Sequence, residues 1–288
     1  MGFFASINGE IVPLEEARIP VLDNGFLFGD SVYEVLRTYG GHPFETGRHF
    51  RRMRASADRL GIAIPVSDED MLARVRALLA RAGDVESYIR IVVTRGVGDS
   101  SYDPGGVVGP TVVMIQKELP RPPESHYSGG VRVSAVDVRR NHPRSLDPAI
   151  KSSNLLNNIL AVREARTRGA EEAVLLNLEG LVAEGASTNL FVVKDATLRT
   201  PPLGVGILGG ITREVVLEIA GSLDIPRDET ALRLDDLLGA DEAFLSSTTR
   251  EVMPVRQVDE KVIGDGRPGP ITRRLMEAFR AYAPAHCG

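Results

Sequence analysis

The chain has 288 residues, of which 43% are hydrophobic and 25% are charged, and its formal net charge at pH 7 is -5. This length suffices for two domains with a substantial core, and the negative charge without basic–aromatic runs argues against nucleic acid as a partner. The one cysteine, Cys287, excludes a disulfide and a cysteine zinc site within one chain, so we expect no metal and a reducing, cytoplasmic location. The N-terminus turns polar too early for a signal peptide, and no apolar stretch is long enough to span a membrane.

Residues 1–117 are predicted to form a small N-terminal α/β domain. Asn8-Gly9 between two short apolar strands is a strong hairpin signal, and the glycines at 40–41 indicate a second hairpin. Residues 21–30 contain too many turn formers for one regular element. Thr46 is expected to cap a helix that carries an apolar stripe. Strands are expected at residues 3–7, 11–12, 31–39, 43–44, 88–95 and 111–115, and helices at 46–60 and 71–82.

A loop and a linker follow these elements. Residues 96–106 form a loop rich in Gly and Asp, and a loop of this length is more often functional than a mere connection. Three prolines stiffen the stretch after the next strand, so we place an interdomain linker at residues 118–128 and a large C-terminal domain at residues 129–288. Strands are expected there at residues 131–136, 172–178, 181–184, 189–193 and 244–249, and helices from Lys151 to about 168, from 209–212 onward, and at 270–283. Because strands and helices mix without strict alternation, the fold class is predicted to be α+β.

Lys151 lies where an extended stretch meets a helix. Pro148 biases the residue before it toward an extended backbone. Leu156, Ile159, Leu160 and Ala161 follow at helical spacing as an apolar run expected to pack in the core. A long amine at such a junction could project into a cleft, but a lone lysine is most often a solvated surface residue. The local pattern leaves both interpretations open.

A lysine that reacts with a carbonyl compound needs a bound partner and groups that hold the partner's charges. If the partner is pyridoxal 5'-phosphate (PLP), its phosphate requires N–H groups, hydroxyls and an arginine, and its ring nitrogen requires an acid. The chain offers a candidate for each need: Gly210-Ile211-Thr212 at a helix start, Ser247-Thr248 at a strand end, Arg52, and Glu184 before small residues. Each also has an ordinary explanation, such as a helix cap or a solvated basic face.

The order of these motifs resembles the class IV, fold-type IV PLP-dependent aminotransferases, the family of branched-chain and D-amino-acid aminotransferases and aminodeoxychorismate lyase. The resemblance covers nearly the whole chain and is highly specific. It is carried by Asn8-Gly9, Phe28 to Val35, His49 to Met53, Lys151 with 154–156, Glu184-Gly185 with 189–191, Gly210 to Arg213, Ser247 to Thr249 and Glu251 to Val255. It implies a two-domain enzyme with its active site between the domains, PLP as the cofactor, and a homodimer or larger assembly.

The resemblance also implies roles for individual residues. Lys151 would bind PLP covalently and then move a proton between the substrate Cα and the cofactor C4′. Glu184 would keep the pyridine nitrogen protonated, and Leu208 would pack on the ring. The residues that would bind the phosphate are Arg52, Ile211, Thr212, Ser247 and Thr248. The residues that would contact the substrate are Phe28, Tyr33, Tyr88, Arg90 and Thr249.

The motifs divide between two branches of this family. Tyr88-Ile89-Arg90 and residues 94–99 are similar to the branched-chain members, in which the strand Tyr and Arg receive the substrate α-carboxylate. Residues 28–35 are similar to the D-amino-acid branch, but the loop at 98–102 has no Arg-x-His pair of that branch. Leu155 and Leu156 stand where some relatives have a tyrosine. Arg250 stands where branched-chain members usually have a small residue, and would either restrict the pocket or offer a second carboxylate contact.

We therefore predict ping-pong transamination between an aliphatic, branched-chain L-amino acid and 2-oxoglutarate, with amino acids and 2-oxo acids as substrates. In this family the loop at 96–106 would close over the neighbouring subunit's site. The alternatives are a D-amino-acid or (R)-amine transaminase, aminodeoxychorismate lyase, and a PLP-binding protein without turnover. Gly209-Gly210 before a helix is only a weak signal for a dinucleotide oxidoreductase, because no Gly-x-Gly-x-x-Gly follows an early strand.

Overall fold

The computed structural model describes residues 2–288, which fold into two compact units. The first unit runs to Pro120 and includes residues 150–154 and 283–288, whereas the second consists of residues 121–149 and 155–282. Lys151 therefore packs with the first unit, although it lies far from the rest of that unit in the sequence. The domain and linker limits taken from the sequence stay a prediction.

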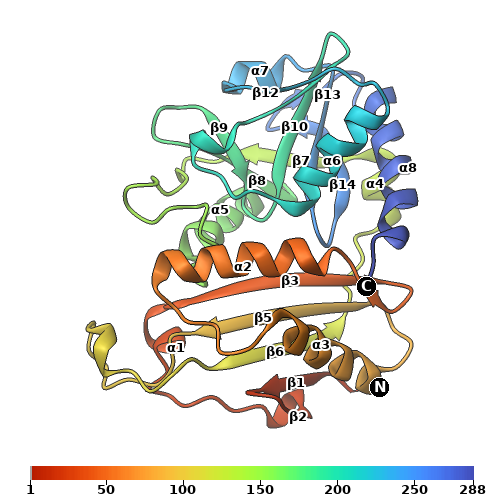
Figure 1. Ribbon diagram of the computed structural model, residues 1–288. Coiled ribbons are helices and arrows are strands. Elements are labelled where there is room, and N and C mark those ends of the chain that lie inside the picture. The colour runs from red at the N-terminus through yellow and green to blue at the C-terminus, as the bar shows by residue number, and fades with distance from the viewer. Residues whose placement is uncertain (1) are drawn as a thin grey trace. The chain divides into compact units, whose positions relative to one another are not determined.

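The first unit is built on a six-stranded antiparallel sheet in which β3, β5 and β6 lie side by side (Figure 1). Its strands are β1 (Phe4–Ile7), β2 (Glu10–Pro13), β3 (Ser31–Tyr39), β4 (His42–Pro43), β5 (Ser87–Thr94) and β6 (Val112–Glu118), in the order β2-β1-β6-β5-β3-β4. Asn8 and Gly9 turn the first hairpin with φ of 52° and 100°, the left-handed conformation that this dipeptide adopts readily. The strands predicted for this half of the chain are confirmed, and β6 extends further than predicted.

The helices α2 (Thr46–Leu60) and α3 (Asp68–Ala82) bury one face of this sheet. Of the predicted stripe of Phe50, Met53, Ala57 and Leu60, the first three are buried and Leu60 is half-buried against the same core. The cap prediction is wrong: Glu45 occupies the cap position, and the Thr46 hydroxyl donates to the carbonyl of Gly288. The C-terminal residues pair with the chain here, which the local sequence could not indicate. The shorter helices of the unit are η1 (Leu14–Glu16), α1 (Asn24–Phe28) and η2 (Pro104–Gly106), of which α1 lies in the stretch expected to be irregular.

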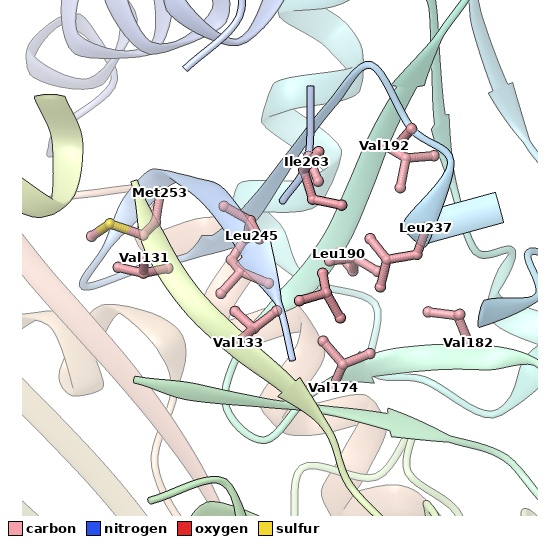
Figure 2. Packing of buried hydrophobic residues seen from close by; sticks show 14 of the residues in the cluster. Val131, Val133, Val174, Val182, Leu190, Val192, Leu237, Leu245, Met253 and Ile263 are labelled. Atoms are coloured by element: carbon pink, nitrogen blue, oxygen red, sulfur yellow. The ribbon is translucent and has the colours of Figure 1, made fainter. Parts of the chain in front are cut away.

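The second unit contains a nine-stranded mixed sheet. Its strands are β7 (Val131–Ala135), β8 (Glu172–Leu176), β9 (Val182–Gly185), β10 (Asn189–Lys194), β11 (Thr197–Thr200), β12 (Arg227–Glu229), β13 (Glu242–Ser247), β14 (Glu251–Val258) and β15 (Lys261–Val262). They are ordered β12-β11-β10-β13-β14-β7-β8-β9, with β15 paired to β14. Figure 2 shows Val133, Val174, Leu190 and Leu245 gathered in the core of this unit, where all are buried. The sheet thus supplies the second hydrophobic core expected from the chain length.

The helices of the second unit are α4 (Glu124–Gly129), α5 (Leu156–Thr167), η3 (Leu203–Val205), α6 (Ile211–Ser222), α7 (Leu234–Leu238) and α8 (Pro270–Ala285), whose last residues belong to the first unit. The expected core run of α5 is wrong for Leu156, Ile159 and Leu160, which are 68%, 59% and 42% exposed, and is confirmed for Ala161. Only Ala161 and Ala165 of that helix are buried, because the helix packs on its sheet through these small residues. Within residues 2–288, none of the helices has the length and apolar character needed to span a membrane.

Candidate active site

The backbone of Lys151 is fixed to the first unit by hydrogen bonds. Its carbonyl accepts from the N–H of Tyr33 at 2.9 Å, and its own N–H donates to Oγ of Ser56 at 3.1 Å. Ser153 N–H then donates to the carbonyl of Ser31 at 3.0 Å. The segment therefore pairs with the start of β3, which keeps it extended until α5 begins. The predicted junction between extended chain and helix is confirmed, but the helix begins at Leu156 and not at Lys151, because residues 151–153 pair with β3.

The Lys151 amine lies beside an aromatic ring and a second cation. Its Nζ is 4.4 Å from the centroid of the Tyr33 ring, and Cζ of Arg90 is 4.0 Å from the same centroid. Tyr33 and Arg90 share one face of the sheet, because Arg90 lies opposite Val35 in the β3–β5 register. Each cation–π contact contributes about 0.5–2 kcal/mol. The three side chains thus form one cluster that fixes where the amine can reach.

This cluster lies on the half-open face of the sheet. Along β5, Tyr88 and Arg90 are partly exposed, whereas Ile89 and Ile91 are buried. The two faces of β5 therefore differ in exposure over residues 87–93. Phe28, at the end of α1, contacts the ring of Tyr102 at a centroid distance of 5.1 Å, and Tyr102 is 91% exposed in the loop that the sequence singled out.

The covered face of β3 carries a buried ion cluster that the sequence analysis missed. The Glu34 carboxylate accepts from Arg52 Nε at 2.7 Å and Nη2 at 2.8 Å, and it lies 2.7 Å from Nδ1 of His49. The side chains of Glu34 and His49 are fully buried. A glutamate among the inward positions of β3, between Val32 and Leu36, was the available signal. Arg52, predicted to bind phosphate, is therefore held in a fixed position by a bidentate ion pair.

The protonation of this cluster follows from burial and charge. Burial by itself would raise the pKa of Glu34, but Arg52 and His49 outweigh it and hold that pKa well below its usual value of 4.5. Burial lowers the pKa of His49 from 6.5, so the neutral imidazole donates its Nδ1–H to Glu34. The cluster thus contains an ionised carboxylate balanced by Arg52.

In the second unit, Glu184 is buried and is the penultimate residue of β9. Its carboxylate accepts from Arg140 Nε at 2.8 Å, from the N–H of Leu208 at 3.1 Å and from Asn189 Nδ2 at 3.3 Å. Arg140 also donates to Asn157 Oδ1 at 3.1 Å. Sequence reasoning missed Arg140, because nothing in the Arg139-Arg140 pair shows which arginine turns inward. A guanidinium beside a buried carboxylate favours its ionised form.

The start of α6 has the properties of an anion site. Gly210 is its N-cap and makes no side-chain capping bond, so the N–H groups of Ile211 and Thr212 have no partner within the helix. Thr212 is 2% exposed and its hydroxyl is buried without a hydrogen-bond partner. A Cβ at Gly210 would lie 1.9 Å from Oδ1 of Asn189, so a larger residue would displace the Asn189 side chain that donates to Glu184. The predicted helix start is confirmed, and its dipole favours negative charge.

The turn between β13 and β14 contains the hydroxyl residues predicted for the site. Ser247 and Glu251 are the last paired residues of the two strands, which leaves Thr248, Thr249 and Arg250 as the connecting turn. The structure thus gathers the predicted residues in two sets. The first unit holds Phe28, Tyr33, Arg52, Tyr88, Arg90 and Lys151, and the second unit holds Glu184, Leu208, Ile211, Thr212, Ser247, Thr248 and Thr249.

Comparison with known proteins identifies the family. The model of the family described as amino-transferase class IV matches residues 31–258. The chain belongs to the class IV aminotransferases. It is an aminotransferase enzyme of fold type IV with mixed helices and strands, and the recognition and α+β predictions are confirmed.

Relatives and solved structures agree with this family. A Methanocaldococcus jannaschii protein, provisionally named branched-chain-amino-acid aminotransferase, is 41% identical over 274 residues, covering 95% of this chain and 94% of that protein. The D-alanine aminotransferase of Staphylococcus epidermidis is 37% identical over 281 residues, covering 97% and 98%. The branched-chain aminotransferase of the thermophilic archaeon Thermoproteus uzoniensis, solved with norvaline, has a TM-score of 0.91 at 33% identity, covering 97% and 94% of the two chains. The Escherichia coli branched-chain amino acid aminotransferase has a TM-score of 0.93 at 30% identity, covering 100% and 97%.

The buried Glu34 carboxylate generates a prediction about acid stability. Because the pKa of Glu34 is lowered on folding, the stability it contributes is present above pH 4.5 and is lost as the pH falls toward the folded value. We expect Glu34→Gln to reduce the slope of unfolding free energy against pH by up to about 1.4 kcal/mol per pH unit, measured by urea unfolding below about pH 4.5. Because burial lowers the pKa of His49 on folding, this side chain also costs stability as the pH falls below 6.5. Glu10→Gln, at an exposed glutamate, is the control, and an unchanged slope in Glu34→Gln would contradict the ion cluster.

Proposed function

We propose that the protein transfers the amino group of an aliphatic, branched-chain L-amino acid to 2-oxoglutarate by a ping-pong mechanism. Class IV aminotransferases are PLP-dependent, and the observation that carries the proposal is the Lys151 amine fixed beside Tyr33 and Arg90. The names of the branched-chain relatives and structural neighbours support the substrate class. A cytosolic location, consistent with a single half-buried cysteine, belongs to the same proposal.

The residues of the second unit fit PLP. The α6 start offers helix N–H groups and the unpartnered Thr212 hydroxyl to a phosphate, and Glu184 offers an ionised carboxylate to a ring nitrogen. Leu208 presents an apolar side chain to the ring while its N–H orients Glu184. When bound, PLP supplies a ring that accepts electrons from the substrate Cα. We assign the binding of the phosphate to Ile211 and Thr212 at the start of α6, together with Arg52, Ser247 and Thr248.

The residues of the first unit act on the substrate in this proposal. Lys151 binds the cofactor covalently and, once displaced by substrate, carries the proton to and from the substrate Cα. Arg90 and Tyr88, with the N–H of Thr249, receive the α-carboxylate, which a guanidinium binds through charge-assisted hydrogen bonds. Tyr33 keeps the amine in place through its ring, and Phe28 contacts the substrate side chain.

Replacing Lys151 tests the covalent role. Lys151→Ala should abolish both covalent cofactor attachment and turnover, because no other group would supply the amine. The fold should persist, since the hydrogen bonds that hold this segment use its backbone. Attachment is measured by borohydride reduction followed by peptide mass, and secondary structure by circular dichroism. Lys117→Ala, at an exposed lysine, is the matched control, and transamination by Lys151→Ala would refute the assignment.

A panel of amino donors tests the substrate class. With 2-oxoglutarate as acceptor, we expect kcat/KM to be highest for L-leucine among L-leucine, D-alanine and (R)-1-phenylethylamine. A D-amino-acid transaminase is the second candidate, favoured by the 37% identity to a D-alanine aminotransferase. Activity confined to D-alanine or the amine would overturn the branched-chain proposal. Pyruvate release from aminodeoxychorismate would indicate a lyase, and bound PLP without any reaction would indicate a binding protein.

We propose that the enzyme is a homodimer. Val21, Phe26, Tyr102 and Val108 of the first unit are 73%, 66%, 91% and 83% exposed, and residues 19–28 bond directly to the loop at 96–106 through Gly98 N–H and the Leu22 carbonyl. The exposed face of α5 adds a second apolar surface. Exposed apolar side chains that gather on neighbouring segments mark candidate association sites.

The dimer proposal predicts the mass in solution. Light scattering should give twice the 31.2 kDa of the chain, or a larger even multiple. Phe26→Glu should shift the distribution toward monomer, because it places a charge on the apolar surface. Val262→Glu, at an exposed apolar residue of β15, should leave the mass unchanged. A monomeric wild-type protein would refute the proposal.

A further inference from the structure

The guanidinium of Arg250 is engaged by a buried carboxylate. Its Nη1 lies 2.5 Å from Oε2 of Glu172, the first residue of β8. The side chain of Glu172 is 2% exposed and that of Arg250 is 32% exposed. A charge buried to this extent needs a partner, and Arg250 provides it.

Glu172 joins two turns of the second unit. Its Oε2 also accepts from the Ser187 hydroxyl at 3.0 Å, and its Oε1 accepts from the N–H of Ala173 at 3.0 Å. Ser187 lies in the turn that follows Glu184 and β9. The carboxylate therefore connects the turn after Glu184 with the turn that carries Thr248 and Thr249.

The backbone of Arg250 is fixed as well. Its N–H donates to Oγ of Ser247 at 3.3 Å, and its carbonyl accepts from the Tyr127 hydroxyl at 3.3 Å. Glu251 follows with φ of 56°, a left-handed conformation that side chains other than glycine and asparagine rarely adopt. Such a conformation persists only where the surroundings enforce it. Arg250, the residue before Glu251, is held by these two hydrogen bonds, and Glu251 itself pairs with Ser247 across the strands.

We propose that Arg250 is a positioning residue that, through Glu172, holds the Thr248-Thr249 turn in the conformation that binds the cofactor phosphate and the substrate carboxylate. The inference depends on the proposed function of that turn. In this role the Nη1 of Arg250 stays on Glu172, because moving the guanidinium away would leave that carboxylate buried without its charged partner. The sequence allowed either a carboxylate contact or a pocket restriction, and the geometry points to a third role.

Cofactor retention by the full-length holoenzyme tests this role. We expect Arg250→Met to raise the apparent dissociation constant of PLP about tenfold, measured by equilibrium dialysis, since loss of a supporting contact typically weakens a site by that order. Arg250→Lys should recover part of the loss. Glu172→Gln should weaken retention similarly, and the double variant should lose less than the sum of both, because no unpaired charge remains. Lys194→Met, which breaks an exposed ion pair with Asp241, is the matched control.

Kinetics separate positioning from substrate binding. A positioning role predicts that the KM values of monocarboxylate and dicarboxylate substrates change together and that PLP retention falls. Unchanged PLP retention in Arg250→Met, with a raised KM for 2-oxoglutarate alone, would overturn the inference, as would full additivity with Glu172→Gln. If the wild-type protein binds PLP without turnover, the proposed transamination fails, while the retention measurements still decide the role of Arg250. Circular dichroism of each variant identifies any that fail to fold, and Arg250→Lys then carries the test.

Discussion

The pairing of residues 151–153 with β3 and α2 is the constraint on which the candidate site depends. These residues are distant in sequence from the rest of the first unit, yet their N–H and carbonyl groups complete hydrogen bonds with Ser31, Tyr33 and Ser56. The pairing satisfies backbone groups that would otherwise be costly to bury. It also fixes the backbone of Lys151, from which the side chain extends to the Tyr33 ring.

Buried carboxylates organise the remaining polar groups. Glu34, Glu172 and Glu184 are each paired with an arginine, and each has further hydrogen-bond donors from neighbouring segments. A paired and fully bonded carboxylate orients every donor around it, whereas loss of one partner leaves a charge in a medium that solvates it poorly. The three clusters therefore fix the positions of Arg52, of the Thr248-Thr249 turn and of the Glu184 side chain. Ion pairs of this kind hold the side chains of loops and strand ends in fixed positions, which a catalytic site requires.

Prediction from sequence succeeded for segments whose signal is local. The hairpin at Asn8-Gly9, the strand at residues 31–39, the buried stripe of α2 and the start of α6 follow from turn chemistry and periodicity. It failed where a distant segment decides the outcome. Thr46 does not cap its helix because residues near the C-terminus pair there, and the α5 leucines remain exposed because the helix packs through alanines. Arg140 and Glu34 were missed because their partners lie far away in the chain.

The sequence by itself determined the family, the helices and strands with strong periodicity, and the candidate residues for PLP, because these depend on residue types and their order. Only the tertiary structure decided which charges meet. Arg52 faces Glu34, Arg140 faces Glu184 and Arg250 faces Glu172 through contacts between segments 18, 44 and 78 residues apart. Ion pairs at such separations carry no local signal, since an arginine has the same helix and strand propensity whether it binds a carboxylate or water. The location of Lys151 has the same origin, because its neighbours Tyr33 and Arg90 lie 118 and 61 residues before it in the sequence.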